Sequence, residues 1–232
     1  MQEWRPAALT VLAVLAILAS WLCPVHSLPN NWPVDTSTIW TSLGLTVIAL
    51  TLLVLRVRYS FRWAELWPIL PGIALNLIIN ALVVSLDLPI FLDTVGTIVV
   101  GVWLSPHAGA VTGLASALLT ALFNPIALDF ASIQAFVGMA AGILAQMGSF
   151  RTPLAAAVSG FLIGMPSSIL AAPLNVTMLG DVFLGDSPFT GILTDVFLVG
   201  PVDKAISFLL AWGVLSATVA KQKPELKPVM AE

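Results

Sequence analysis

Long runs of hydrophobic residues, interrupted by short polar segments, follow one another along this chain. Runs of about twenty apolar residues predict helices that cross the roughly 30 Å hydrocarbon layer of a bilayer, whereas spanning strands would alternate polar and apolar residues. Eight helical spans are predicted, at residues 7–23, 36–55, 66–86, two within 94–128, 130–148, 153–172 and 198–220. The two spans within 94–128 are divided at Ser105–Gly109, a segment of turn-forming residues.

Composition excludes the soluble alternative. Hydrophobic residues make up 59% of the 232 residues and charged residues 9%, whereas soluble domains carry about 25% charged residues. The chain is therefore predicted to be an all-α polytopic membrane protein embedded in the lipid bilayer. It has no basic patch that would bind nucleic acid.

The few basic residues predict the orientation. Short cytoplasmic loops of membrane proteins hold the Lys and Arg residues. With both termini placed in the cytoplasm, all basic residues but Lys204 fall on the cytoplasmic side, namely Arg5, Arg56, Arg58, Arg62, Arg151, Lys221, Lys223 and Lys227. The opposite loops instead carry aspartates, at Asp35, Asp87, Asp129, Asp181 and Asp186.

The two terminal segments are considered separately from the spans. Residues 1–27 could be a cleaved signal peptide, but their apolar run exceeds the usual 7 to 15 residues, which favours a retained helix. Residues 221–232 are polar and contain Pro224 and Pro228, so this tail is expected to be disordered.

Polar side chains inside or at the edges of the spans form the candidate substrate-binding site, because burying them is costly unless they pair or line a site. Most of them gather toward the outer side of the membrane. They are Asn76, Asn80, Phe91, Asp93, Thr94, Thr97, Asn124, Asp129, Gln134, Asn175, Asp203 and Lys204, accompanied by Phe123, Phe130 and Phe136.

Each of these residues also has a structural interpretation. The asparagines of the third span could simply hydrogen-bond between helices, and the phenylalanines could contact lipid. Asp129 could cap the helix that follows it. Asp203 and Lys204 could neutralise each other, although neighbouring side chains on a helix point about 100° apart, which makes Asp93 a candidate partner of Lys204 across the bundle.

No catalytic or metal signature accompanies these residues, and the chain is predicted not to be an enzyme and to bind no metal or cofactor. Gly164–Ser168 lacks the second glycine of a serine-nucleophile elbow. His26 and His107 are predicted on opposite sides of the membrane, and there is no nucleotide-binding loop.

Small residues recur every four positions in the fifth predicted span, at Gly109, Gly113, Ala117 and Ala121. Such a stripe lets two helices approach closely. It could dock a partner protein, or it could pack inside the bundle.

Three segments resemble a known family: Leu88–Thr97 (LPIFLDTVGT), Ser105–Gly113 (SPHAGAVTG) and Pro201–Lys204 (PVDK). Together they are similar to the substrate-binding S component of an energy-coupling factor (ECF) vitamin transporter. The resemblance covers residues 68–220 and implies a six-helix core, preceded by two additional helices in residues 1–67. The Ala-x-x-x-Ala signature by which many S components meet their coupling protein is missing from the third span.

The resemblance implies a subunit that captures a scarce micronutrient outside a prokaryotic cell. Such subunits pair with a transmembrane coupling protein and two cytoplasmic ATPases, which use the ATP. The family's pocket lies on the outer side under the loop between its first two helices, which corresponds here to Ser85–Asp93.

The polar and aromatic side chains favour a flat heteroaromatic substrate with hydrogen-bond donors on its edge. Three aspartates and one lysine would leave an anionic ligand without countercharges. Two other functions remain open: a membrane sensor or assembly module without transport, and an autonomous secondary transporter, which should show internal repeats.

Overall fold

Helices account for all the regular structure in the described part of the computed structural model, which comprises residues 4–27, 36–86, 91–178 and 188–222. Five helical stretches are long and apolar enough to cross a bilayer. They contain α1 (Trp4–Ser27), α2 (Thr36–Arg58), α3 (Ile69–Ser85), α7 (Pro153–Met178) and α9 (Gly200–Gln222). The prediction of a helical, multi-pass membrane protein is confirmed.

Three of the eight predicted spans are too short to cross on their own. Helix α4 (Val95–Trp103) has 9 residues, and α5 (Pro106–Ala121) and α6 (Ala131–Gln146) have 16 residues each. At 1.5 Å per residue, α4 extends about 14 Å, half of the hydrocarbon thickness. Its side chains are buried from Val95 to Gly101, so its hydrophobicity reflects contact with other helices and not with lipid.

The last long stretch begins earlier than predicted and is irregular. Helix α8 (Pro188–Thr194) continues through the π-helical turn η4 (Asp195–Val199) into α9. This stretch places Asp195 inside a helix and not in an outer loop. Residues 221 and 222, which were predicted to belong to a disordered tail, are part of α9, while residues 223–232 lie outside the described part of the chain.

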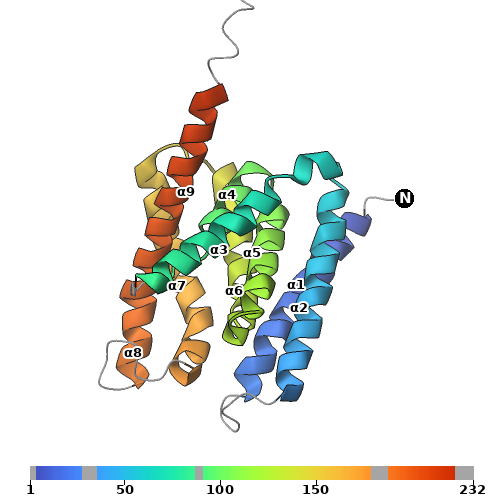
Figure 1. Ribbon diagram of the computed structural model, residues 1–232, viewed down its shortest axis with the longest axis vertical. Coiled ribbons are helices and arrows are strands. Elements are labelled where there is room, and N and C mark those ends of the chain that lie inside the picture. Colours follow the sequence, from blue (N-terminus) through green and yellow to red (C-terminus); the bar gives the residue numbers. More distant parts are fainter. Residues whose placement is uncertain (1–3, 28–35, 87–90, 179–187, 223–232) are drawn as a thin grey trace, which may run out of the picture.

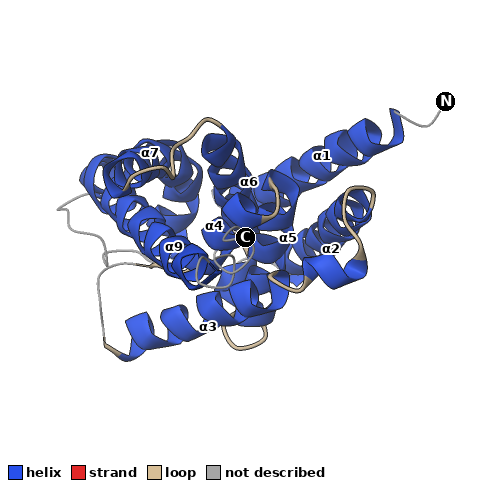
Figure 2. Cartoon of the chain, turned by 90° about the horizontal axis from the view of Figure 1, so that it is seen from above, coloured by secondary structure: helices blue, strands red, loops and turns tan. Residues whose placement is uncertain are grey.

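The helices form three groups (Figures 1 and 2). The α1–α2 hairpin lies on one side, the α7–α9 pair on the other, and α4, α5 and α6 lie between them. Helix α3, preceded by the 3-10 turn η1 (Trp63–Leu66), runs obliquely across α4 and α5. The two additional N-terminal helices therefore pack on the opposite flank of the central group from α7 and α9.

The stripe of small residues on α5 lies inside the bundle. A Cβ atom at Gly109 would lie 2.6 Å from the carbonyl oxygen of Gly138, and one at Gly113 would lie 2.6 Å from that of Gln134. Ala117 is fully buried on the same helix. The stripe is thus the contact face between α5 and α6 and is not available to a partner, because the close helix approach that small residues permit is used internally.

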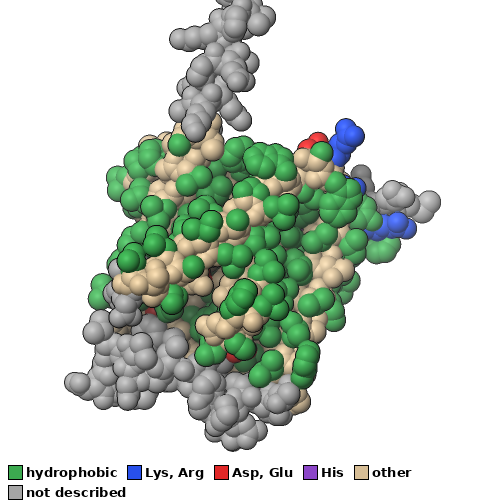
Figure 3. Space-filling view, in the orientation of Figure 1, with side chains coloured by type: hydrophobic (Ala, Val, Ile, Leu, Met, Phe, Trp, Pro, Cys, Tyr) green, Lys and Arg blue, Asp and Glu red, His purple; other side chains and the backbone are tan. Residues whose placement is uncertain are grey.

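The surface of the bundle is apolar and its described basic residues are grouped. Figure 3 shows a face on which hydrophobic side chains are abundant and charged ones are few, with Lys and Arg side chains gathered at its upper right edge. The start of α1, the α2–α3 connection and the α6–α7 connection all lie at the upper end of the bundle in Figure 1. Arg56, Arg58, Arg62 and Arg151 lie at these connections, and the orientation of this end toward the cytoplasm remains a prediction.

The topology can be tested by cysteine labelling in a Cys23→Ser background. Phe123 follows α5 at the lower end of Figure 1 and is 88% exposed, whereas Ser60 is exposed after α2 at the upper end. A membrane-impermeant maleimide should label Phe123→Cys in intact cells and Ser60→Cys only after lysis. The reverse labelling pattern would invert the orientation. Asp186, which was also predicted to be external, lies outside the described residues.

Candidate binding cavity

A cavity of about 200 Å³ lies between the central helices and the α7–α9 pair, toward the lower end of Figure 1. Its wall combines polar groups, two phenylalanine rings and small apolar residues. The lining residues are Asn76, Asn80, Phe91, Asp93, Thr94, Ser116, Thr120, Asn124, Ile126, Ala127, Phe130, Ile133, Gln134, Ser167, Ser168, Ala171, Asn175, Asp195, Gly200, Asp203 and Lys204.

Ten of the twelve predicted site residues line this cavity, and Thr97 and Asp129 do not. Thr97 is fully buried and its hydroxyl accepts a hydrogen bond from Asn76. Asp129 is half-buried between the 3-10 turn η2 (Pro125–Leu128) and α6, and burial raises its pKa to about 6. Asp129 does not cap α6 either, because the residue in the N-cap position is Phe130.

Asn76 joins three helices through both ends of its amide. Its Nδ2 donates to Oγ1 of Thr97 at 2.8 Å and to Oγ of Ser116 at 2.9 Å. Its Oδ1 accepts from the backbone N–H of Gly96 at 2.7 Å. A Cβ atom on Gly96 would overlap the backbone of Gly72, so this position lets α3 approach α4 closely. Asn76 therefore serves the interhelical role that the sequence left open.

Lys204 lies among several acceptors at the start of α9. Its Nζ donates to Oδ2 of Asp203 at 2.7 Å and to Oγ1 of Thr94 at 3.3 Å, and it lies 3.8 Å from Oδ1 of Asp93. The shorter of the two ion pairs is the one with Asp203, because the long lysine side chain bends back to its own neighbour in sequence. Asp93 remains a second, longer contact.

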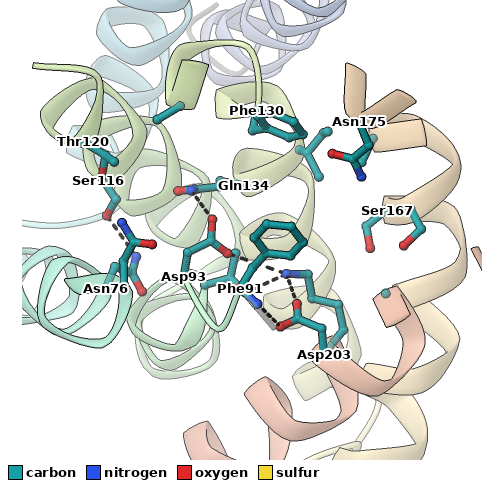
Figure 4. Close-up of a pocket in the computed structure, with 18 of the residues that line it drawn as sticks. Asn76, Phe91, Asp93, Ser116, Thr120, Phe130, Gln134, Ser167, Asn175 and Asp203 are labelled. Carbon is teal, nitrogen blue, oxygen red and sulfur yellow. Dashed lines mark hydrogen bonds and ion pairs between the residues drawn. The ribbon is translucent and has the colours of Figure 1, made fainter. Parts of the chain in front are cut away.

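Asp203 holds the segment that leads into α4. Its Oδ1 accepts from the successive backbone N–H groups of Phe91 and Leu92, at 3.1 and 2.9 Å. Leu92 has a φ of 45°, a left-handed conformation that is uncommon for a leucine. Successive N–H groups in such a conformation form an anion-binding concavity, so Asp203 and Leu92 together fix Phe91 at the edge of the cavity (Figure 4).

Two carboxylate–amide pairs stand in the cavity wall. Nε2 of Gln134 donates to Oδ2 of Asp93 at 2.7 Å, and Nδ2 of Asn175 donates to Oδ2 of Asp195 at 3.0 Å. Because each amide donates its nitrogen to a carboxylate, its carbonyl oxygen takes no part in the pair. Oε1 of Gln134 and Oδ1 of Asn175 are buried without a hydrogen-bond partner in the described structure.

Sequence reasoning did not select five polar lining residues, namely Ser116, Thr120, Ser167, Ser168 and Asp195. Ser116 and Thr120 are four residues apart on one face of α5, a spacing that could have identified them. The serine pair was considered only as a nucleophile motif. Asp195 lies before the start of the last predicted span at residue 198, and the π-helical turn that carries it has no sequence signature. Such π-turns are frequent at functional sites.

Comparisons with protein-family models, with curated proteins and with solved structures found no match to this chain.

Proposed function

We propose that this chain is the membrane-embedded substrate-binding subunit of an ECF-type importer, which captures a small heteroaromatic micronutrient from outside a prokaryotic cell. The observation that carries the proposal is the cavity, which combines acceptors, donors and phenylalanine rings at the end of the bundle opposite the basic connections. Ligand sites are concave and mostly apolar, with a few placed polar groups, and the wall of this cavity has that character.

The segment from Phe91 to Asp93 supports the comparison with S components. It leads into α4 and contributes Phe91 and Asp93 to the cavity wall, and it belongs to the segment that the resemblance assigns to the cover of the pocket. The PVDK segment contributes Asp203 and Lys204 to the same wall. Two of the three resembling segments thus meet at one cavity, while the third, Ser105–Gly113, lies at the start of α5 and packs against α6.

The partners are part of the proposal. A transmembrane coupling protein and two cytoplasmic ATPases would supply the energy for release of the ligand inside the cell. The stripe on α5 cannot contact the coupling protein, because α6 covers it. Docking therefore has to use an outer face of the bundle.

The experiment is an uptake assay in cells that express this chain with a candidate coupling protein and two ATPases. Accumulation of the substrate should require intact ATPases. A membrane sensor would bind the substrate without accumulating it, and a secondary transporter would accumulate it equally well with inactive ATPases. Either of those two results would contradict the proposal.

A further inference from the structure

We infer that the ligand of this cavity carries a positive charge, which lies against Asp195 and the carbonyl oxygen of Asn175. This inference rests on the proposed function and deepens it, because it selects cationic hydrogen-bond donors among the small solutes that the cavity could hold.

The charges in the wall are unevenly compensated. Three aspartates and one lysine line the cavity. Lys204 pairs with Asp203 at 2.7 Å and lies 3.8 Å from Asp93, so two of the three carboxylates share the one cation. Asp195 forms no ion pair within 4.0 Å among the described residues and interacts with Lys204 only at longer range, although it is only 4% exposed.

Asp195 is also poor in hydrogen bonds. Its only side-chain hydrogen bond in the described part of the chain comes from Nδ2 of Asn175. A buried carboxylate with so little compensation is costly, and this one lies in a stretch long enough to span the bilayer. A bound cation would supply the missing charge and the missing hydrogen bonds together.

The surplus of acceptors extends beyond Asp195. The unpartnered oxygens of Asn175 and Gln134 belong to side chains that are 4% and 6% exposed and line the cavity. Lys204, the strongest donor in the wall, already donates to Asp203 and Thr94. The buried polar side-chain atoms of the described wall that have no partner are thus carbonyl oxygens, and a ligand with hydrogen-bond donors would satisfy them.

Gln134 and Asn175, whose oxygens lack partners, also have a defined place relative to the aromatic rings. In the view of Figure 4, the rings of Phe91 and Phe130 lie between Gln134 on one side and Asn175 on the other. A flat ring held by the phenylalanines would therefore lie between these two amides. Phenylalanine faces attract cations as well, so the aromatic part of the wall favours the same ligand.

The test uses three probes with the same phenyl ring and different charges: benzamidine, which is cationic, neutral benzamide and anionic benzoate. Thermal-shift titrations of the purified protein in detergent, after its native ligand has been washed away, give the three apparent Kd values. Benzamidine should bind at least about tenfold more tightly than benzamide, the scale of a charge-assisted hydrogen bond, and benzoate should not bind.

Asp195→Asn, which keeps the shape and removes the charge, should abolish the preference for benzamidine over benzamide. Asp129→Asn is the matched control, because Asp129 does not line the cavity, and its preference should equal that of the wild type. The three-probe comparison on the wild type stands by itself if Asp195→Asn does not fold.

Two results would overturn the inference. One is that benzamide or benzoate binds as tightly as benzamidine, and the other is that none of the three probes binds. Both leave the proposed function in place, since its own failure is read from the dependence of uptake on the ATPases.

Discussion

Replacing Lys204 by methionine should lower the free energy of unfolding by about 3 to 5 kcal/mol, the cost of removing one partner from a buried ion pair. Both Asp203 and Asp93 lose the only cation within 4.0 Å of them in the described part of the chain. Asp203 also holds the backbone of Phe91 and Leu92, so the edge of the cavity should loosen and ligand affinity should fall. Melting in detergent and calorimetric titration with the identified ligand measure the two effects.

Val202→Met is the matched control for this experiment. It introduces the same side chain two residues away, at a position that is 38% exposed on the same helix. Its melting temperature and affinity should stay close to those of the wild type. If Lys204→Met melts and binds like Val202→Met, the ion cluster has no role in stability or binding.

Replacing Gly113 by leucine should prevent the bundle from folding, or destabilise it by at least about 3 kcal/mol, the upper range for overpacking. The new Cβ would lie 2.6 Å from the carbonyl oxygen and 2.7 Å from the carbonyl carbon of Gln134. The neighbouring atoms are backbone and cannot rotate away, so α6 would have to move. Because Gln134 holds Asp93 from α6, the cavity would be distorted as well.

Gly213→Leu provides the comparison, because a Cβ atom at Gly213 meets nothing within 4 Å. Size-exclusion chromatography in detergent should give a monodisperse peak for Gly213→Leu and little or none for Gly113→Leu. A folded Gly113→Leu with wild-type melting would mean that α5 and α6 do not approach as closely as described.

The helical type of the long elements followed from the apolar runs, but the lengths of the elements did not. In residues 94–128, the absence of charge is the same whether a helix faces lipid or is surrounded by other helices. Helix α4 is of the second kind, with its side chains buried from Val95 to Gly101. Only the arrangement of the neighbouring helices distinguishes the two cases, and that arrangement is a tertiary property.

The cavity was largely predictable because polar residues are rare in this chain. Asn76, Asp93, Gln134, Asn175 and Lys204 stand out against an apolar background, and all five line it. Their partners were not predictable, since hydrogen bonds depend on side-chain conformation. Lys204 donates a hydrogen bond to its sequence neighbour Asp203, and Asn76 forms hydrogen bonds with Thr97, Ser116 and Gly96.

The most direct test of the central claim is mass spectrometry of the small molecules that co-purify with this chain. Wild-type protein and Ala74→Phe, which adds a ring at an exposed position of α3, should carry the same small heteroaromatic compound. Ala171→Phe, which places that ring in the cavity wall, should carry none. Equal amounts of the compound in Ala171→Phe, or no specific compound on the wild type, would contradict the claim that this cavity binds a solute.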